Sequence, residues 1–495
     1  METSKSRLRV ESTSLFFAAK FYIKPAATVK IFCYNRLKLM ISGGKALFSS
    51  RRLLHVRLFF EGALVGIFTG AIVATLRFLL DEADIYRPIV FAQVNSLGKL
   101  IFAGGLMLLL AIFLSKAINF DSQVAGSGIP QIKDILQGRS HMIKPFRLLA
   151  LKFFATITAI GAGMSLGRAG ISVQFGAAVG NFFTRIFYAE NIHHETVEGK
   201  FLLTAGAGAG LAAIFNAPLA AVIFCIEELR NRFSQEILIA AVTASVTASF
   251  VVKIFFGVRP VFETITATSI HIPPVTTVPT IEMIANLSAA PIKFFLLFIS
   301  LGFLCGILGA LFSKSLIFAL NTYDRLKIFG VKRFAIPLLL AIPLGIKFPQ
   351  ILGCGNVLVD EILVVHLSLS LLIIFFVGKI LYTLICFGTN APGGLFLPVL
   401  VIGALIGNIF ARIGNDLHIF TADWTTLFII FGMAAFFAAV VKAPITGSIL
   451  ILELTGQFSH LVGLIVVSGA AFMISDLLGG KPIFSAIMER SHDKN

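Results

Sequence analysis

Long runs of apolar residues, separated by short polar segments, dominate the chain. Three clear examples are Phe59–Leu80, Leu100–Leu114 and Phe294–Leu311. A hydrocarbon core of about 30 Å is crossed by roughly 20 helical residues, so several runs can span a membrane as helices. Other runs are short or are interrupted by Gly and Pro. Interrupted helices exist at membrane depth only where protein or a water-filled cavity satisfies their backbone, so the pattern predicts a transporter or channel.

Composition supports a membrane protein. Of the 495 residues, 57% are hydrophobic and 13% are charged, and the mean hydropathy is +0.92. Soluble proteins carry about 25% charged residues. So few charges cannot cover the surface of a soluble particle of this size. We therefore expect lipid to cover much of the protein.

The net charge of +16 does not indicate a nucleic-acid partner, because much of it is local. The first 57 residues hold 12 Lys and Arg against two Glu. The positive-inside rule makes residues 1–54 a basic cytoplasmic segment that touches anionic lipid. Its apolar runs are too short and too often broken by Lys for a signal peptide. We expect a bacterial-type inner membrane.

The chain is an internal duplication. Shifted by 226 or 227 residues, it matches itself at several unusual patterns that occur in the same order, which favours two homologous halves. Residues 55–256 form the first predicted membrane repeat and 291–488 the second, with a Pro- and Thr-rich linker at 257–290 and a tail at 489–495. The matching positions include Gly206 with Gly432, Pro218 with Pro444, Glu227 with Glu453, Lys152 with Lys379, and Gly167 with Gly393-Gly394.

Duplicated transporters commonly place their site where the halves meet, and they build it from broken helices whose ends point at the ion. The sequence does not show whether the halves are parallel or inverted. Inversion is the commoner arrangement when both halves contribute broken helices.

Three glycine-rich segments have the composition of anion-binding helix starts. They lie at 126–130, 167–171 and 393–398, each directly before an apolar run. The first four N–H groups of a helix are unpaired and the helix dipole is positive there, whereas full positive charges would hold an anion too tightly. Gly allows close approach, and Pro costs no hydrogen bond at a helix start. One such segment alone is more often a turn or a tight helix crossing, but three of them, two at repeat-related positions, favour an ion site.

These segments resemble the motifs of the CLC family of chloride channels and proton-coupled chloride transporters, over about residues 55–490. The GSGIP pattern is complete at 126–130 and GxFxP at 394–398, while GK/REGP is met only partly at 167–171. The resemblance implies an all-α polytopic membrane protein with two inverted repeats, broken and tilted helices, and re-entrant helix starts. It also implies a homodimer that passes chloride and needs no cofactor.

The resemblance assigns a chloride site. From its spacing alone, Ser127 would more often be a helix N-cap, but with the complete family pattern its hydroxyl is expected to contact a central chloride. The predicted chloride-binding residues are Gly126, Ser127, Gly128, Ile129, Pro130, Gly167, Arg168, Ala169, Gly170, Ile171, Gly394, Leu395, Phe396, Leu397, Pro398 and Phe484.

Two gating side chains depart from the family pattern. Ala169 stands where most members carry a Glu that competes with chloride and carries the proton. A methyl group can do neither. Ile171 replaces the usual Pro, and Phe484 replaces a Tyr whose hydroxyl contacts the anion. Taken alone, Phe484 is equally well explained as a packing residue.

Three ionisable residues are candidates for a proton relay. Glu228 matches the inner glutamate of the transporter branch, Glu227 precedes it, and Lys152 matches a buried lysine. An ionisable group inside a membrane is costly, and so is a functional candidate by default. Without an outer carboxylate, the structural interpretation of Glu228 is favoured: it would be a partner of Lys152 or Arg230, or a helix-end charge at the cytoplasmic surface.

Passive chloride conduction, channel-like or by an uncoupled carrier, is the favoured hypothesis because of Ala169. The alternative is an H⁺/Cl⁻ antiporter in which another acid replaces the gate, and a non-transporting scaffold is a third hypothesis. The chain has no P-loop, no HExxH and no Cys/His metal cluster, and its five Cys are scattered. His193-His194 is interpreted as part of a solvated loop. We therefore predict neither an enzyme nor a metal site.

Overall fold

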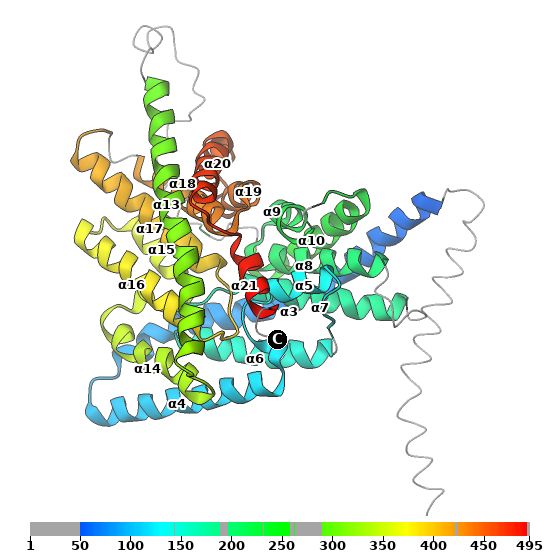
Figure 1. Cartoon of the computed structure of the whole chain (residues 1–495), viewed down its shortest axis with the longest axis horizontal. Coiled ribbons are helices and arrows are strands. Elements are labelled where there is room, and N and C mark those ends of the chain that lie inside the picture. Colours follow the sequence, from blue (N-terminus) through cyan, green and yellow to red (C-terminus); the bar gives the residue numbers. More distant parts are fainter. Residues whose placement is uncertain are drawn as a thin grey trace, which may run out of the picture.

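The computed structural model describes residues 50–142, 144–188, 197–230, 232–257, 262, 290–420 and 424–492. Within these ranges the chain forms 17 α-helices and no strand (Figure 1). They are α3 (Ser50–Ala92), α4 (Leu97–Phe120), α5 (Ile129–Leu136), α6 (Pro145–Gly161), α7 (Ala169–Phe187), α8 (Val197–Phe215), α9 (Pro218–Phe224), α10 (Gln235–Phe256), α13 (Ala290–Arg325), α14 (Val331–Lys347), α15 (Asn356–Val364), α16 (Leu369–Gly388), α17 (Phe396–Asp416), α18 (Thr425–Val441), α19 (Pro444–Thr455), α20 (Leu461–Leu477) and α21 (Ile483–His492). Short helical segments are η1 (Ser122–Val124), η3 (Cys225–Arg230), η4 (Pro349–Ile351) and η6 (Phe458–His460).

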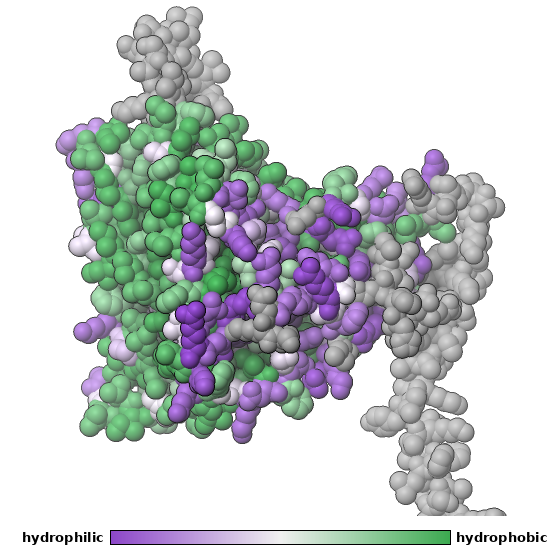
Figure 2. Space-filling view, viewed as in Figure 1, coloured by the Kyte–Doolittle hydropathy of each residue, from purple (hydrophilic) through white to green (hydrophobic). Residues whose placement is uncertain are grey.

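The protein is an integral membrane protein. Seven of the described helices are long and apolar enough to cross a membrane, whereas α8, α18 and α19 are apolar but shorter. Large apolar side chains such as Phe102 and Phe250 are exposed, and Figure 2 shows hydrophobic residues covering the broad face over α13 and its neighbours. This mixture of long and short apolar helices confirms the expected polytopic fold with broken helices.

Equivalent glycines bring helices together in both halves. A Cβ on Gly176 of α7 would lie 1.8 Å from the Gly206 carbonyl oxygen of α8. In the second half, a Cβ on Gly403 of α17 would lie 2.5 Å from the Gly432 carbonyl oxygen of α18. These two pairs are related by the sequence repeat. Any larger residue would push the helices apart, so the duplication preserves one helix-packing geometry.

The two halves also cap each other's helices. Glu227 of η3 accepts hydrogen bonds from the backbone N–H groups of Ile445, at 3.2 Å, and Thr446, at 2.7 Å, at the start of α19. Its repeat partner Glu453 accepts from Leu219, at 3.1 Å, and Ala220, at 2.8 Å, at the start of α9.

This exchange is what a two-fold relation between the halves produces. It fits the fold of two inverted repeats predicted from the sequence. The bounds of the repeats, at 55–256 and 291–488, stay predictions. Most of the basic segment 1–54 and of the linker 257–290 lies outside the described residues.

We predict that Glu453→Gln destabilises the protein. A carboxylate at a helix start makes charge-assisted hydrogen bonds and interacts favourably with the helix dipole. Losing that charge between the halves should lower the free energy of unfolding by about 1–3 kcal/mol. Thermal unfolding of the detergent-solubilised protein measures this loss.

Asp416→Asn is the matched control. Asp416 forms an exposed ion pair with Arg412, in which Arg412 Nε lies 3.9 Å from Asp416 Oδ1. Exposed pairs contribute little, so this variant should unfold at the wild-type temperature. Equal losses in the two variants would contradict the cap interpretation.

Candidate functional site

The three glycine-rich helix starts meet in space. The Gly167 N–H donates to the Gly394 carbonyl at 2.6 Å, and the Gly394 N–H donates back to the Gly167 carbonyl at 2.5 Å. The Gly126 N–H donates to the Asn390 carbonyl at 3.0 Å, and the Gly393 N–H donates to the Gly126 carbonyl at 3.4 Å. Segments from both halves are therefore joined directly through their backbones.

Glycine is required where these starts touch. A Cβ on Gly170 would lie 2.6 Å from the Ser127 carbonyl oxygen, and one on Gly394 would lie 3.0 Å from the Gly170 backbone nitrogen. Gly128 has a φ of +95°, and a Cβ there would lie 2.9 Å from the Gly170 carbonyl oxygen. The structure thus brings the starts of α5, α7 and α17 together, as the motifs predicted.

Ser127 offers a buried hydroxyl at this junction. The residue is 2% exposed, and its Oγ has no hydrogen-bond partner within the described part of the chain. Gly128, not Ser127, is the N-cap of α5, and α5 receives no side-chain cap. The N-cap alternative is therefore wrong. An unpaired buried hydroxyl costs about 1–3 kcal/mol, so a ligand for it is expected. The role of Ser127 as a chloride ligand stays a prediction.

Ala169 is the first residue of α7 and is fully buried. The N-cap of α7 is Arg168, which makes no side-chain cap bond, so no side chain competes for the first N–H groups through the cap position. The Arg168 guanidinium instead pairs with Asp81 of α3. The helix start therefore keeps its dipole, while the neighbouring full charge is compensated elsewhere.

Phe396 and Phe484 form an apolar wall. Their rings are stacked with centroids 5.9 Å apart, and both side chains are fully buried. Phe396 is the first residue of α17 and also packs edge-on against Phe437 and Phe224. The ring of Phe484 therefore joins the α17 helix start without supplying a hydroxyl.

Lys133 of α5 is a residue that the sequence analysis missed. Its Nζ lies 2.7 Å from Glu228 Oε1 and donates to Ser485 Oγ at 2.9 Å. The side chains of Lys133 and Glu228 are 4% and 5% exposed, so the pair is buried. Glu228 is thus a partner of Lys133, not of Lys152 or Arg230 as considered from the sequence. The pair joins α5, η3 and α21.

The other two relay candidates have separate partners. Lys152 donates to Gln174 of α7, and Glu227 caps α19 across the halves. Within the described residues, neither of them forms a direct hydrogen bond with Glu228. Their role in proton transfer stays a prediction, while the cap gives Glu227 a structural reason of its own.

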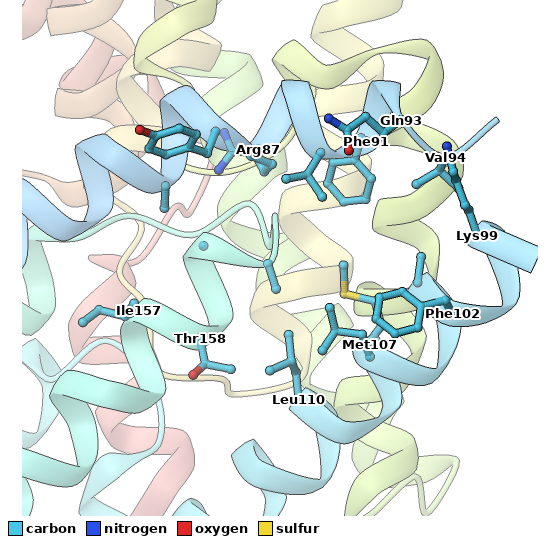
Figure 3. A pocket seen from close by; sticks show the side chains of 17 residues that line it. Arg87, Phe91, Gln93, Val94, Lys99, Phe102, Met107, Leu110, Ile157 and Thr158 are labelled. Atoms are coloured by element: carbon cyan, nitrogen blue, oxygen red, sulfur yellow. The ribbon is translucent and has the colours of Figure 1, made fainter.

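A cavity of about 610 Å³ lies apart from these residues, between α3, α4 and α6. Figure 3 shows its mainly apolar side chains, with Arg87, Gln93, Lys99 and Thr158 among them. None of the predicted chloride-binding residues lines it. The described residues hold no group of three His, Cys, Asp or Glu suited to a metal ion, and His193-His194 lies outside them.

An all-helical membrane protein whose uncapped helix starts converge on a buried hydroxyl has the features of an anion channel or transporter. Residues 107–476 match the family model described as voltage gated chloride channel. The chain therefore belongs to this family. Chloride transport of the CLC type is the activity that family, fold and site jointly support.

Curated relatives extend the match. The chain is 33% identical over 421 residues to the H⁺/Cl⁻ exchange transporter ClcA of Vibrio campbellii, covering 83% of this chain and 82% of the relative. It is 36% identical over 386 residues to ClcA of Vibrio cholerae, covering 75% and 76%.

Two solved structures have the same fold. A slow cyanobacterial Cl⁻/H⁺ antiporter matches with a TM-score of 0.78 and 26% identity, covering 89% of this chain and 99% of that one. A eukaryotic CLC transporter matches with a TM-score of 0.68 and 21% identity, covering 88% and 74%, which bears on the fold alone.

We predict that Ser127→Ala weakens chloride binding on the order of 10- to 100-fold, because a hydrogen bond to a charged partner is worth about 1.5–3 kcal/mol. Calorimetric titration of the purified protein with chloride measures the affinity.

Ser468→Ala is the matched control. Ser468 of α20 also has a buried hydroxyl without a partner among the described residues, but it belongs to none of the three helix starts. Its variant should bind chloride as the wild type does. An unchanged chloride affinity in Ser127→Ala would show that this hydroxyl does not bind chloride.

Proposed function

We propose that this chain conducts chloride passively, as a channel or an uncoupled carrier. The observation that carries the proposal is Ala169, fully buried at the start of α7. Coupled exchange needs a group for which proton binding and chloride binding exclude one another. A methyl group at this position neither accepts a proton nor imitates an anion, so chloride meets no acidic competitor from it.

The Lys133–Glu228 pair supports the same proposal. The Glu228 carboxyl bonds to the buried Lys133 ammonium at 2.7 Å, while burial raises the pKa of Glu228 more than Lys133 lowers it. Protonating Glu228 would leave the Lys133 charge uncompensated in a buried site, and breaking a buried pair costs about 3–5 kcal/mol. Proton uptake by Glu228 would therefore require Lys133 to lose its charge or find another partner at the same time.

The second candidate is H⁺/Cl⁻ exchange. It is favoured by the Vibrio relatives, which are named H⁺/Cl⁻ exchange transporters. An acid other than residue 169 would then have to serve as the outer gate. Asp81 is a candidate, because it pairs with Arg168 beside the start of α7 and its side chain is 36% exposed. The opposing observation is that this pairing already occupies the carboxylate.

We further propose that the protein is a homodimer in a bacterial-type inner membrane. The Vibrio relatives and the basic amino-terminal segment support that location. Exposed apolar side chains on α9, α10, α19 and α20, such as Leu219 and Ile445, offer a surface for a second copy. The family consists of channels and transporters, which agrees with a protein that is not an enzyme.

We predict that the purified protein in liposomes carries chloride without protons. The reversal potential should follow the chloride Nernst potential and should not shift when a pH gradient is imposed. Proton uptake driven by a chloride gradient would contradict passive conduction and favour exchange. The absence of any anion flux would favour a non-transporting protein.

We predict that Ala169→Glu makes chloride flux depend on pH. The new carboxylate should occupy the α7 start when ionised and release it when protonated, so flux should rise as the pH falls. Liposome flux at several pH values measures the change.

Ala169→Gln is the matched control, because it has the same size but cannot ionise. It should slow flux equally at every pH. If flux through Ala169→Glu were independent of pH, residue 169 would not face the anion path.

A further inference from the structure

A second cavity, of about 530 Å³, lies between α13 and α21, at the carboxyl end of the described chain. Its charged lining residues come from both helices and from the turn before α21: Lys314, Lys481, Glu489 and Arg490. Figure 2 shows hydrophilic residues gathered around the end of α21, beside the large hydrophobic face. We call this cavity the α13–α21 crevice.

The α13–α21 crevice carries more positive than negative charge, with three cations against Glu489. Lys481 Nζ lies 3.3 Å from Glu489 Oε2, and both side chains are largely exposed, at 73% and 56%. Exposed pairs of this kind are worth little, so a stronger anion can displace the Glu489 carboxylate from Lys481. Lys314 donates to the Leu478 carbonyl at 2.9 Å, and no carboxylate of the described residues forms an ion pair with it.

Arg490 anchors the other end of the α13–α21 crevice. Its Nε donates to Asn321 Oδ1 at 2.7 Å, and its guanidinium pairs with Asp324, which is shared with Arg333. Burial lowers the pKa of Arg490, and the Arg333 charge adds to that shift. A further anion beside Arg490 would therefore be favourable, because two guanidinium groups share a single carboxylate.

Ser313 is an independent indication of a ligand. It lines the α13–α21 crevice, is 5% exposed, and its hydroxyl has no hydrogen-bond partner in the described ranges. A hydroxyl beside two lysines and an arginine is a donor set that suits phosphate oxygens. The volume lies within the range of small-molecule sites and exceeds what a single halide requires.

We propose that the α13–α21 crevice binds a phosphate-bearing anion, which ties α21 to α13. Lys314 would reach it from α13, Lys481 from the turn before α21, and Arg490 from α21 itself. Glu489 would be released from Lys481 when the anion arrives. The binding site does not depend on the proposed chloride conduction.

An anion bound in the α13–α21 crevice would act through α21 on the inner side of the predicted chloride path. Lys481 lies three residues before Phe484, whose ring stacks on Phe396 at the start of α17. The next residue, Ser485, accepts a hydrogen bond from Lys133. Fixing α21 to α13 would restrict movement of these two side chains. We therefore infer that the bound anion slows chloride flux, a step that rests on the proposed function.

Binding is tested first, by calorimetric titration of the detergent-solubilised full chain with pyrophosphate. Lys481→Gln and Lys314→Gln should each weaken binding by about tenfold, the loss of one charge-assisted contact. Glu489→Gln should strengthen it, because the competing carboxylate is gone. Lys347→Gln, an exposed charge change at the end of α14, should leave binding unaltered.

Pyrophosphate binding that is absent, or equal in all four variants, would overturn the site. Lys481→Gln is the decisive variant, because Lys481 is exposed and, among the described residues, pairs only with the exposed Glu489, so its loss should not affect folding. Stronger binding by Glu489→Gln is a result that a merely structural role of this pair does not produce.

Flux is tested second, in liposomes with pyrophosphate on one side at a time. Pyrophosphate on the side of α21 should slow chloride flux about fivefold or more, and Lys481→Gln should remove the effect. If pyrophosphate binds but chloride flux is unaltered, the regulatory step is overturned and the binding site still stands. Liposomes with phosphatidic acid, without pyrophosphate, distinguish a lipid headgroup from a soluble anion: slowing there identifies the lipid, and its absence identifies the soluble source.

Discussion

An anion inside a membrane must exchange its water shell for hydrogen-bond donors that carry no full charge. Unpaired N–H groups at helix starts meet this need only if several starts come within contact of each other. That contact is what Gly167, Gly170 and Gly394 provide, since a Cβ on any of them would press on a neighbouring segment. The close approach in turn requires rigid packing of α7 on α8 and of α17 on α18, which Gly176 and Gly403 allow.

The full charges around the site are paired in ways that leave the helix starts neutral. Arg168 pairs with Asp81 and Lys133 with Glu228, while Lys152 bonds to the amide of Gln174. The first two pairings keep positive charge from trapping the anion. They also occupy the carboxylates that a proton route would use. Ala169 and Phe484 remove the two polar groups that the family pattern places on the path. On the proposed function, anion binding and proton binding are thereby separated.

The sequence predicted those features that depend on local chemistry or on the repeat. Without coordinates we could recognise Gly and Pro at helix starts, and the equivalence of Glu227 and Glu453 in the sequence repeat. Their meaning was only partly evident: Glu227 was predicted as a relay candidate, whereas the structure places it on the start of α19. The cap depends on contact between residues more than 200 positions apart, which no local pattern encodes.

Lys133 is a clearer example of this limit of sequence-based prediction. Its partner Glu228 is 95 residues away, and Ser485 is 352 residues away. The available signal was a Lys in the middle of the short apolar helix Ile129–Leu136, where a buried charge needs a partner. The α13–α21 crevice likewise joins residues of α13 with Lys481 and Arg490. Such sites arise from packing, so the sequence alone could not assemble them.

We propose that chloride binds here without displacing or recruiting a proton. Calorimetric titration of chloride in two buffers of different ionisation enthalpy tests it directly, because any proton exchanged with the buffer adds the enthalpy of buffer ionisation. We expect the same binding enthalpy in both buffers. A difference between the two enthalpies that corresponds to a proton taken up with each chloride would contradict it.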